Sequence, residues 1–239
     1  MFDLSGKRIL ITGAGGAIGT ETARLCASIG GDLVLTDLKA PQALADELRG
    51  LGRDVSAVAM DVTDRAAVET TIREVGPLDG VVANAGYCPF DDWTEDGWDG
   101  AFLKVMDVNV AGTFHVVRAS MPAMMERGGG RIVIVTSIAG RIGGVRSSPH
   151  YVAAKGGLNA FVKWAARRAA RSGVLVNGIA PGPTRSAMTA DQPYDASGIP
   201  VGRMAEPQEM AGPIAFLLSP AASYICGSVI DVNGGIFMH

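Results

Sequence analysis

The chain has 239 residues, of which 48% are hydrophobic and 19% charged, and its formal net charge is −3. This composition is typical of a folded globular protein and excludes an intrinsically disordered chain. The slightly acidic balance excludes the broad basic surface of a nucleic-acid-binding protein, and no run reaches the roughly 18 apolar residues needed to span a membrane.

The three cysteines, Cys26, Cys88 and Cys226, are widely spaced and lack a CxxC motif or a histidine-rich context. This pattern argues against a disulfide framework and against a metal site, and it favours reduced thiols. The first residues enter a strand-like run at once, which leaves no room for a signal peptide. We therefore expect a cytoplasmic protein that contacts neither a membrane nor nucleic acid.

Short apolar runs alternate with longer segments of helical pattern along the chain. The predicted strands are residues 7–12, 32–37, 54–61, 79–84, 131–136, 174–180 and 228–232, and the predicted helices include residues 17–29, 64–75, 96–126, 150–171 and 207–218. The strands are nearly continuous in apolar character, which is typical of strands buried on both faces. The alternation predicts an α/β fold in one domain spanning residues 1–239, with a doubly wound, seven-stranded parallel sheet and helices on both faces.

The connection after the first predicted strand is rich in glycine, "ITGAGGAIGTE". In a doubly wound sheet such a turn lies at the carboxyl edge, where the N-terminus of the next helix can bind a pyrophosphate. Gly13 would permit the tight turn, Gly15 and Gly16 a close approach of the backbone to phosphate, and Gly19 close packing of helix on strand. The turn therefore predicts a dinucleotide site.

The second predicted strand ends at Asp37. A carboxylate at this position can accept hydrogen bonds from both ribose hydroxyls of an adenosine and would repel a 2′-phosphate. The glycine-rich turn contains no lysine or arginine that could offset this repulsion. The sequence therefore favours NAD over NADP, although Asp37 could instead cap the segment that follows.

The segment "SSPHYVAAKGG" places Tyr151 and Lys155 four residues apart in a predicted helix, so that both side chains lie on one face. An unperturbed phenol has a pKa near 10, and lowering it toward 7 requires about 4 kcal/mol of phenolate stabilisation. We expect the Lys155 ammonium and an oxidised nicotinamide to provide it, which would make Tyr151 a general acid/base. Ser137, at the end of a strand, could hold a substrate oxygen nearby or cap the next segment.

Two further segments bear on the surroundings of this pair. Gly156 and Gly157 thin the predicted helix and allow another helix to approach, either across a subunit interface or within one core. Residues 183–203 lack periodicity and contain three prolines, which predicts a substrate-binding loop over the carboxyl edge of the sheet.

These motifs, taken in order, resemble those of the short-chain dehydrogenase/reductase family over essentially the full chain, which implies a Rossmann fold and a homotetramer. The family's cofactor motif matches "TGAGGAIG", with Ala17 where glycine is commoner, and later family motifs match "MDV", "NAG", "DVNVAG" and "NGIAPGPTRSAM". The resemblance implies a catalytic tetrad of Asn109, Ser137, Tyr151 and Lys155. It implies cofactor contacts from Gly13, Gly16, Ala17, Ile18, Gly19, Asp37, Asp61, Val62, Asn84, Ala85, Gly86, Tyr151, Lys155, Pro181, Gly182, Thr184 and Ser186.

The resulting hypothesis is reversible hydride transfer between NAD and a secondary alcohol or ketone. Tyr151 would exchange the proton, Lys155 would lower the pKa of Tyr151 and bind the nicotinamide ribose, Ser137 would orient the substrate, and Asn109 would hold a water that leads protons toward Lys155. One alternative is a 3-oxoacyl-[acyl-carrier-protein] reductase, with a basic patch of Arg127, Arg168 and Arg171 for the carrier. Another is a regulatory protein that binds NAD(H) without catalysis.

The expected substrate pocket is formed by residues 87–93, 140–148 and 183–203. Phe90, Trp93, Met188 and Tyr194 favour an apolar or aromatic small-molecule substrate. Arg141, Arg146 and Arg185 could bind an anionic group or could lie at the surface. His150 precedes the tyrosine and is expected to cap the helix rather than line the pocket.

Overall fold

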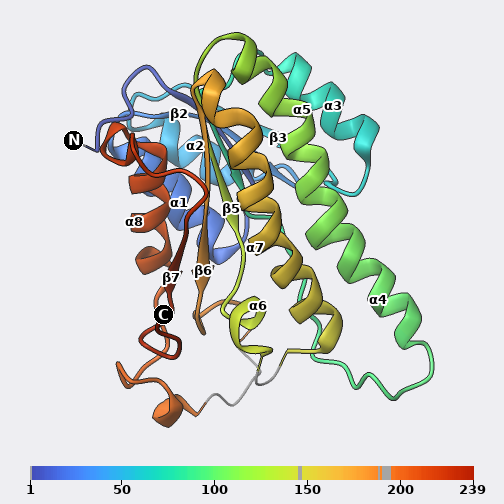
Figure 1. The fold of residues 1–239 in the computed structure, drawn as a ribbon. Helices are drawn as coiled ribbons and strands as arrows, with labels where there is room; N and C mark the ends of the chain where they lie inside the picture. The colour runs from blue at the N-terminus through green and yellow to red at the C-terminus, as the bar shows by residue number, and fades with distance from the viewer. Residues whose placement is uncertain (1, 145–146, 188, 190–194) are drawn as a thin grey trace.

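The computed structural model describes residues 2–144, 147–187, 189 and 195–239. Within these residues it contains a sheet of seven parallel strands in the order β3-β2-β1-β4-β5-β6-β7 (Figure 1). The strands are β1 (Arg8–Thr12), β2 (Asp32–Asp37), β3 (Val55–Ala59), β4 (Gly80–Ala83), β5 (Gly130–Val135), β6 (Val174–Pro181) and β7 (Val229–Val232). The predicted fold class and each predicted strand are confirmed.

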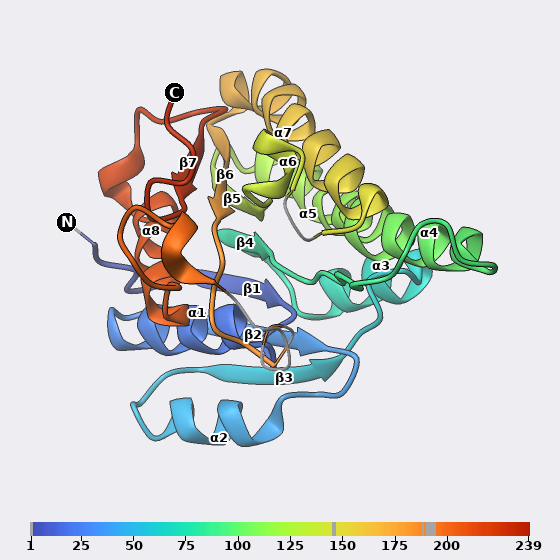
Figure 2. The ribbon, with the colours of Figure 1, turned by 90° about the horizontal axis from the view of Figure 1, so that it is seen from below.

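Helices cover both faces of this sheet. Helices α1 (Ala17–Ser28), α2 (Gln42–Arg49) and α8 (Pro207–Leu218) pack on one face, and α3 (Arg65–Glu74), α5 (Gly112–Glu126) and α7 (Pro149–Ala169) pack on the other (Figure 2). Helix α2 is not among the helices predicted from the sequence. Among the described residues, none of the helices combines the length and apolar character needed to cross a membrane.

The strands separate two hydrophobic cores. In β1, Leu10 faces the core beneath α3, α5 and α7, whereas Ile9 and Ile11 face the core beneath α1, α2 and α8. Because successive side chains of a strand point to opposite faces, a strand buried on both sides must be apolar at every position. This explains the continuous apolar runs on which the fold prediction rested.

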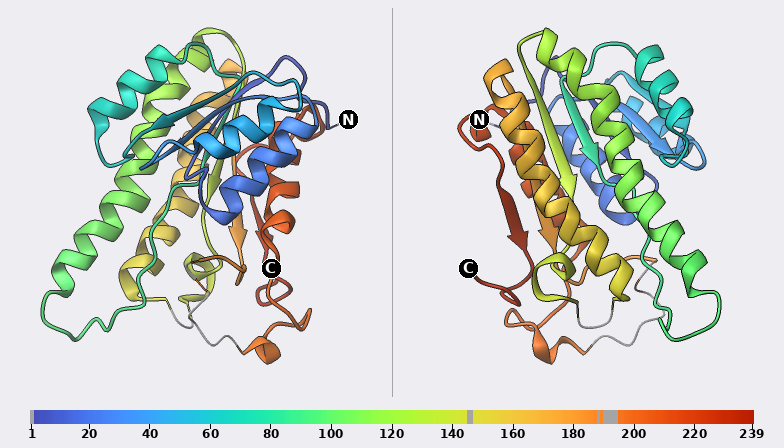
Figure 3. Two further views of the ribbon diagram at one scale, coloured as in Figure 1. Left: turned by 180° about the vertical axis from the view of Figure 1, so that it is seen from behind. Right: turned by 45° about the vertical axis from the view of Figure 1, so that its right-hand side comes forward.

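The predicted helix at residues 96–126 is interrupted. Helix α4 (Trp98–Met106) leads into a π-helical turn, η1 (Asp107–Ala111), before α5 begins, and the combined rod extends past the end of the sheet (Figure 3). A π-helical turn inserts one extra residue into a helix and is frequent at functional sites. Asn109 lies at the centre of this π-helical turn and is buried.

The remaining short elements lie at both edges of the sheet, with α6 and η3 at the carboxyl edge. Helix α6 (Ala139–Ile142) follows β5, and η3 (Ala196–Gly198) lies in the predicted substrate loop, where an isolated bridge also joins Thr184 to Ala205. The turns η2 (Ala170–Ser172) and η4 (Pro220–Ala222) end α7 and follow α8. The strand order reverses between β1 and β4, which is the position where ligands bind in open α/β sheets.

Candidate active site

The glycine-rich turn between β1 and α1 leaves no room for a side chain at Gly13, and the first turn of α1 leaves none at Gly19. Gly13 has a φ of +64°, and a Cβ added there would lie 2.9 Å from the Ala85 Cα. A Cβ on Gly19 would lie 2.2 Å from the Gly13 carbonyl oxygen. Gly16 precedes the first residue of α1, and no side chain caps the helix. The N-terminal amides of α1 and the bare backbone beside them fit the phosphates of a dinucleotide.

Asp37 is fixed at the end of β2 by backbone amides. Its Oδ2 accepts a hydrogen bond from the Gly15 amide at 2.9 Å, and its Oδ1 accepts one from the Leu38 amide at 2.8 Å. The carboxylate therefore lies against the glycine-rich turn, as expected for a group that meets the adenosine ribose. Asp61 caps its own turn by accepting hydrogen bonds from the Thr63 amide and hydroxyl, each at 2.8 Å.

The segment after β4 is tied to β1 by side-chain hydrogen bonds. The side-chain nitrogen of Asn84, Nδ2, donates hydrogen bonds to the carbonyls of Thr12 and Gly13, both at 3.0 Å. The Thr12 hydroxyl accepts hydrogen bonds from the backbone amides of Asn84 at 3.0 Å and Ala85 at 3.1 Å. These bonds hold the two chain segments together where the strand order reverses. Val62 is held on the same edge, since its carbonyl lies 2.9 Å from Nδ1 of His115.

Tyr151 lies in the first turn of α7, and Lys155 follows it one turn later. The Lys155 Nζ lies 5.6 Å from the centre of the Tyr151 ring and donates a hydrogen bond to the Val135 carbonyl at 3.0 Å. Ser137 lies two residues beyond β5; its hydroxyl accepts a hydrogen bond from the Ala139 amide at 3.1 Å and lies near enough to Tyr151 to lower the pKa of the phenol. The structure therefore brings Ser137, Tyr151 and Lys155 together at the carboxyl edge.

Asn109 meets the same group from the π-helical turn. A Cβ placed on Gly86 would lie 3.0 Å from Oδ1 of Asn109 and 3.5 Å from Nζ of Lys155, so these three residues surround one point. The Asn109 side chain makes two hydrogen bonds to the backbone of Tyr87. It donates to the Tyr87 carbonyl at 2.7 Å and accepts from the Tyr87 amide at 3.3 Å. Its role in holding a water remains a prediction.

Without cofactor, the protein holds the pKa of the Tyr151 phenol above its ordinary value, and the lowering expected from Lys155 together with an oxidised nicotinamide stays a prediction. Burial raises the pKa of Tyr151 well above its ordinary value, the nearby Cys88 raises it further once its thiol is ionised, and the Ser137 side chain only partly opposes these effects. Burial also lowers the pKa of Lys155 to about 8. Removal from water disfavours the charged forms of both groups, so Lys155 alone cannot pull the Tyr151 pKa toward 7.

Cys88, within residues 87–93 of the expected pocket wall, lies close to Tyr151 and Lys155. It is buried, and burial raises the pKa of its thiol to about 11, while the electrostatic influence of Lys155 opposes the shift. Its position directly after the "NAGY" segment was the available signal, because that segment ends beside Lys155. A thiol with so high a pKa stays protonated and acts as a small, weakly polar wall group.

The segment after β6 folds back on the C-terminal region. A Cβ on Gly182 would lie 2.7 Å from the Asn233 Cα, and the Thr184 hydroxyl donates to the Gly182 carbonyl at 3.0 Å. The hydroxyls of Ser186 and Thr189 lie 3.3 Å apart. Pro181 ends β6, so this proposed cofactor segment also starts at the carboxyl edge.

Two arginines considered for an anionic substrate group are paired with carboxylates. Arg141 lies 3.2 Å from Asp231, with side chains only 14% and 13% exposed, and Arg185 lies 2.9 Å from Glu206. Arg146, Met188 and Tyr194 lie outside the described residues. Phe90 and Trp93 are on the loop before α4 and are 41% and 64% exposed.

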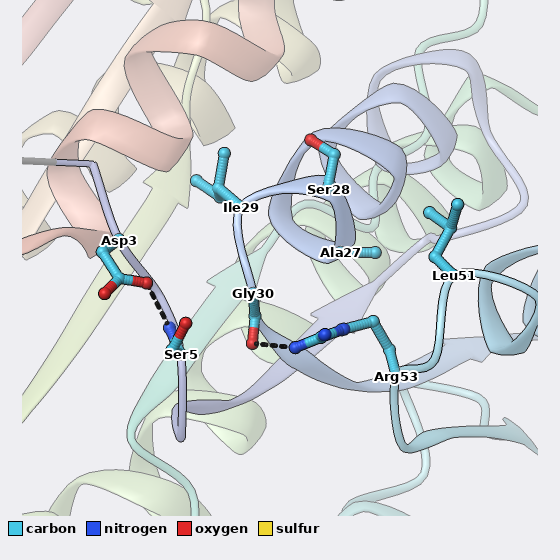
Figure 4. Close-up of a pocket in the computed structure, with 8 residues that line it drawn as sticks. All are labelled: Asp3, Ser5, Ala27, Ser28, Ile29, Gly30, Leu51 and Arg53. Atoms are coloured by element: carbon cyan, nitrogen blue, oxygen red, sulfur yellow. Dashed lines mark hydrogen bonds between the residues drawn. The ribbon is translucent and has the colours of Figure 1, made fainter.

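A surface hollow of about 480 Å³ lies away from the residues described above. Its lining includes Asp3, Gly30 and Arg53, which precede β1, β2 and β3 in the chain, and the Arg53 guanidinium donates to the Gly30 carbonyl (Figure 4). The start of each parallel strand marks the amino edge of the sheet. The hollow is therefore at the edge opposite Tyr151 and is not part of the candidate active site.

Comparison with known proteins gives the family. Residues 13–237 match the family model described as enoyl-(acyl carrier protein) reductase, a model of short-chain dehydrogenases/reductases. This chain belongs to the short-chain dehydrogenase/reductase family. Members of this family bind a nicotinamide cofactor, and the chain is an oxidoreductase that acts on alcohols and ketones with such a cofactor.

Individual members of the family are similar over nearly their whole length. Cyclohexanol dehydrogenase from Acinetobacter sp. is 36% identical, over 95% of this chain and 94% of its own. The 3-oxoacyl-[acyl-carrier-protein] reductase from Vibrio harveyi is 34% identical, over 99% of each chain. The crystal structure of a candidate NAD(P)-dependent gluconate 5-dehydrogenase from Beutenbergia cavernae, with NADP bound at low occupancy, has a TM-score of 0.93 at 32% identity and covers 98% of each chain.

Proposed function

We propose that this short-chain dehydrogenase/reductase interconverts a secondary alcohol and its ketone with NAD, using Tyr151 as general acid/base. The observation that carries the proposal is the meeting of Ser137, Tyr151 and Lys155 beside the bare glycine-rich turn, at one edge of the sheet. When bound, the nicotinamide exchanges a hydride with the substrate carbon.

The protein's residues would handle the substrate oxygen and its proton. In ketone reduction the protonated Tyr151 donates to the oxygen, and in alcohol oxidation the phenolate accepts from it. The Ser137 hydroxyl would hold the same oxygen where negative charge develops. Lys155, tied to Val135, would bind the nicotinamide ribose and stabilise the phenolate, and Asn109 would hold a water close to Lys155.

The remaining predicted cofactor residues would hold the dinucleotide along the carboxyl edge. Gly13, Gly16, Ala17, Ile18 and Gly19 would face the phosphates, because they form the turn and the first residues of α1. Contacts to the adenosine, the nicotinamide ribose and the carboxamide would come from Asp37, Asp61, Val62, Asn84, Ala85, Gly86, Pro181, Gly182, Thr184 and Ser186.

A preference for NAD is supported by Asp37. Its carboxylate is held in place by two backbone amides, so it cannot swing away from a 2′-phosphate without losing both bonds. Dissociation constants for NADH and NADPH, measured by fluorescence, test this directly. We expect NADH to bind at least tenfold more tightly than NADPH. The Asp37→Asn variant should reduce this difference in affinity, because it removes the charge while keeping the side-chain size. Tighter binding of NADPH by the unaltered protein would refute the assignment.

A small alcohol or ketone is a better substrate candidate than an acyl carrier protein. The proposed carrier patch includes Arg168, at the far end of α7 from Tyr151. At about 1.5 Å per helical residue, the two lie about 25 Å apart along the helix. Arg168 also stacks over Trp164 at 5.2 Å, and Arg127 donates to the Leu78 carbonyl at 2.6 Å. The similarity to 3-oxoacyl-[acyl-carrier-protein] reductases keeps acyl thioesters in the substrate panel.

The decisive experiment is an activity panel with NAD(H) that includes secondary alcohols, cyclic ketones, sugar alcohols and acyl thioesters. We expect turnover of an uncharged alcohol–ketone pair and its loss in the Tyr151→Phe variant, which keeps the ring and removes the hydroxyl. Tyr224→Phe is the matched control because Tyr224 is fully exposed. NADH binding without turnover of any substrate in the panel would instead favour a regulatory NAD(H)-binding protein.

Assembly as a homotetramer is supported by an aromatic surface on α5 and α7, which lie side by side (Figure 3). Phe114 and Phe161 stack at 4.0 Å, and Trp164 continues the stack at 5.9 Å while 54% exposed. Nothing lies within 4 Å of a Cβ placed on Gly157, so the helix surface there is open to close approach. Light scattering should give a tetramer for the unaltered protein and a smaller species for Trp164→Glu.

A further inference from the structure

His150, directly before Tyr151, is buried and connects the catalytic helix to the loop that follows β4. Its Nδ1 accepts a hydrogen bond from the Tyr151 amide at 3.0 Å, and its Nε2 lies 3.2 Å from Oδ2 of Asp91. Since Nδ1 accepts from an N–H, the ring proton lies on Nε2 and points at the carboxylate. The indole of Trp98 packs on the imidazole, with ring centres 5.1 Å apart. The imidazole is thus held by contacts on three sides.

Asp91 is held in turn by the residue that starts the helix. The Ser148 hydroxyl lies in hydrogen-bond contact with Oδ1 of Asp91 and 2.9 Å from the Asp91 carbonyl. Partial burial disfavours the ionised carboxyl, but hydrogen bonding by Ser148 and the interaction with His150 outweigh this effect and lower the pKa of Asp91. The carboxylate is therefore ionised at neutral pH and joins Ser148 to His150.

The other end of the same loop segment is also anchored. The Asn109 side chain holds both the amide and the carbonyl of Tyr87. Residues 87–91 are thus fastened at one end to the π-helical turn and at the other to the start of α7. Cys88, between these anchors, is the buried thiol that lies near Tyr151 and Lys155.

We propose that Asp91 and His150 are positioning residues for the reaction, which fix the Tyr151 phenol and the Cys88 wall relative to each other. The proposal rests on the proposed role of Tyr151 as acid/base. A shift of about 1 Å in a reacting group can cost about 100-fold in rate, so loosening this connection should lower kcat while leaving the distant glycine-rich turn intact.

Single substitutions can separate the two bonds of the imidazole. His150→Asn keeps a hydrogen-bond acceptor near the position of Nδ1 but cannot reach Asp91. His150→Phe keeps the aromatic packing on Trp98 and removes both hydrogen bonds. Asp91→Asn removes the negative charge that faces the imidazole. Asp92→Asn is the matched control, because the exposed Asp92 carboxylate bonds only to Thr94 among the described residues. Each variant is compared with the unaltered protein in kcat, substrate KM, NADH dissociation constant and melting temperature.

We expect kcat to fall by about tenfold in Asp91→Asn and by ten- to 100-fold in His150→Phe, with partial recovery in His150→Asn. NADH binding should remain within twofold in all of them, and Asp92→Asn should match the unaltered protein. A kcat within twofold of normal in both Asp91→Asn and His150→Phe would overturn the proposal. So would losses of kcat that merely follow losses of NADH affinity and melting temperature, because that pattern indicates general destabilisation.

The Tyr151→Phe variant, assayed beside them, separates this proposal from the proposed function. Persistent turnover in Tyr151→Phe would refute the acid/base assignment and, with it, the positioning role. Loss of turnover in Tyr151→Phe together with normal His150 and Asp91 variants would overturn the positioning role alone.

Discussion

The two sides of the active site are constructed differently. On the cofactor side, the turn between β1 and α1 depends on missing side chains and on hydrogen bonds donated by the backbone, such as those from the Gly15 and Leu38 amides to the Asp37 carboxylate. On the substrate side, side chains from distant parts of the chain pair with one another, such as His150 with Asp91 and Arg141 with Asp231. The first construction tolerates almost no change, whereas the second can vary from one protein to another on the same fold.

Among the substitutions considered, the largest loss of function is expected on the cofactor side of the site. A side chain at Gly19 would meet the Gly13 carbonyl at 2.2 Å, a backbone contact that cannot move aside. Gly19→Val should therefore abolish NADH binding, measured by fluorescence titration, and reduce the yield of folded protein. Gly100→Ala is the control, because a Cβ on that helical glycine meets nothing within 4 Å and NADH binding should not change. Normal cofactor binding by Gly19→Val would contradict the role given to the turn.

The pH dependence of the two reaction directions probes the substrate side. Because burial raises the pKa of Tyr151, the phenol is protonated at neutral pH in the free protein and is ready to donate to a ketone. Alcohol oxidation needs the phenolate, so its kcat/KM should rise by up to about tenfold per pH unit from pH 7 until the phenol ionises. Ketone reduction needs the phenol and should not rise over that range. Equal pH profiles in the two directions would be inconsistent with Tyr151 as the proton carrier.

The smallest effect on catalysis is expected at Arg141. Because its pairing with Asp231 is largely buried, Arg141→Met should leave Asp231 with His239 as its remaining partner, remove the bond to the Val229 carbonyl and destabilise the fold by about 1–3 kcal/mol, measured by urea unfolding. Lys7→Met, which breaks an exposed pair with Asp79, should cost less than about 1 kcal/mol. Substrate KM should change little in Arg141→Met. A large rise in KM would show that Arg141 binds the substrate and that its pairing with Asp231 is incidental.

The same contrast explains how far the sequence could predict the molecule. The strands, most of the helices and the Asp37 position follow from local patterns, namely continuous apolar runs, glycine spacing and the residue that ends β2. The pairs Arg141–Asp231 and Asp91–His150 join residues 90 and 59 positions apart, and no local pattern encodes such a partnership. Spacing likewise predicts that Tyr151 and Lys155 meet, but not how much water the fold removes from them, so the raised pKa of Tyr151 in the free protein could not be predicted from the sequence.

The central claim is that Tyr151 moves the proton and that its pKa falls only when cofactor is present. The direct test is the tyrosinate absorbance of the unaltered protein minus that of Tyr151→Phe, followed over pH with and without NAD⁺. The account predicts that the Tyr151 signal appears only above about pH 10 in the free protein and at least one pH unit lower with NAD⁺ bound. A signal already present near pH 7 without cofactor, or one that NAD⁺ does not move, would contradict it.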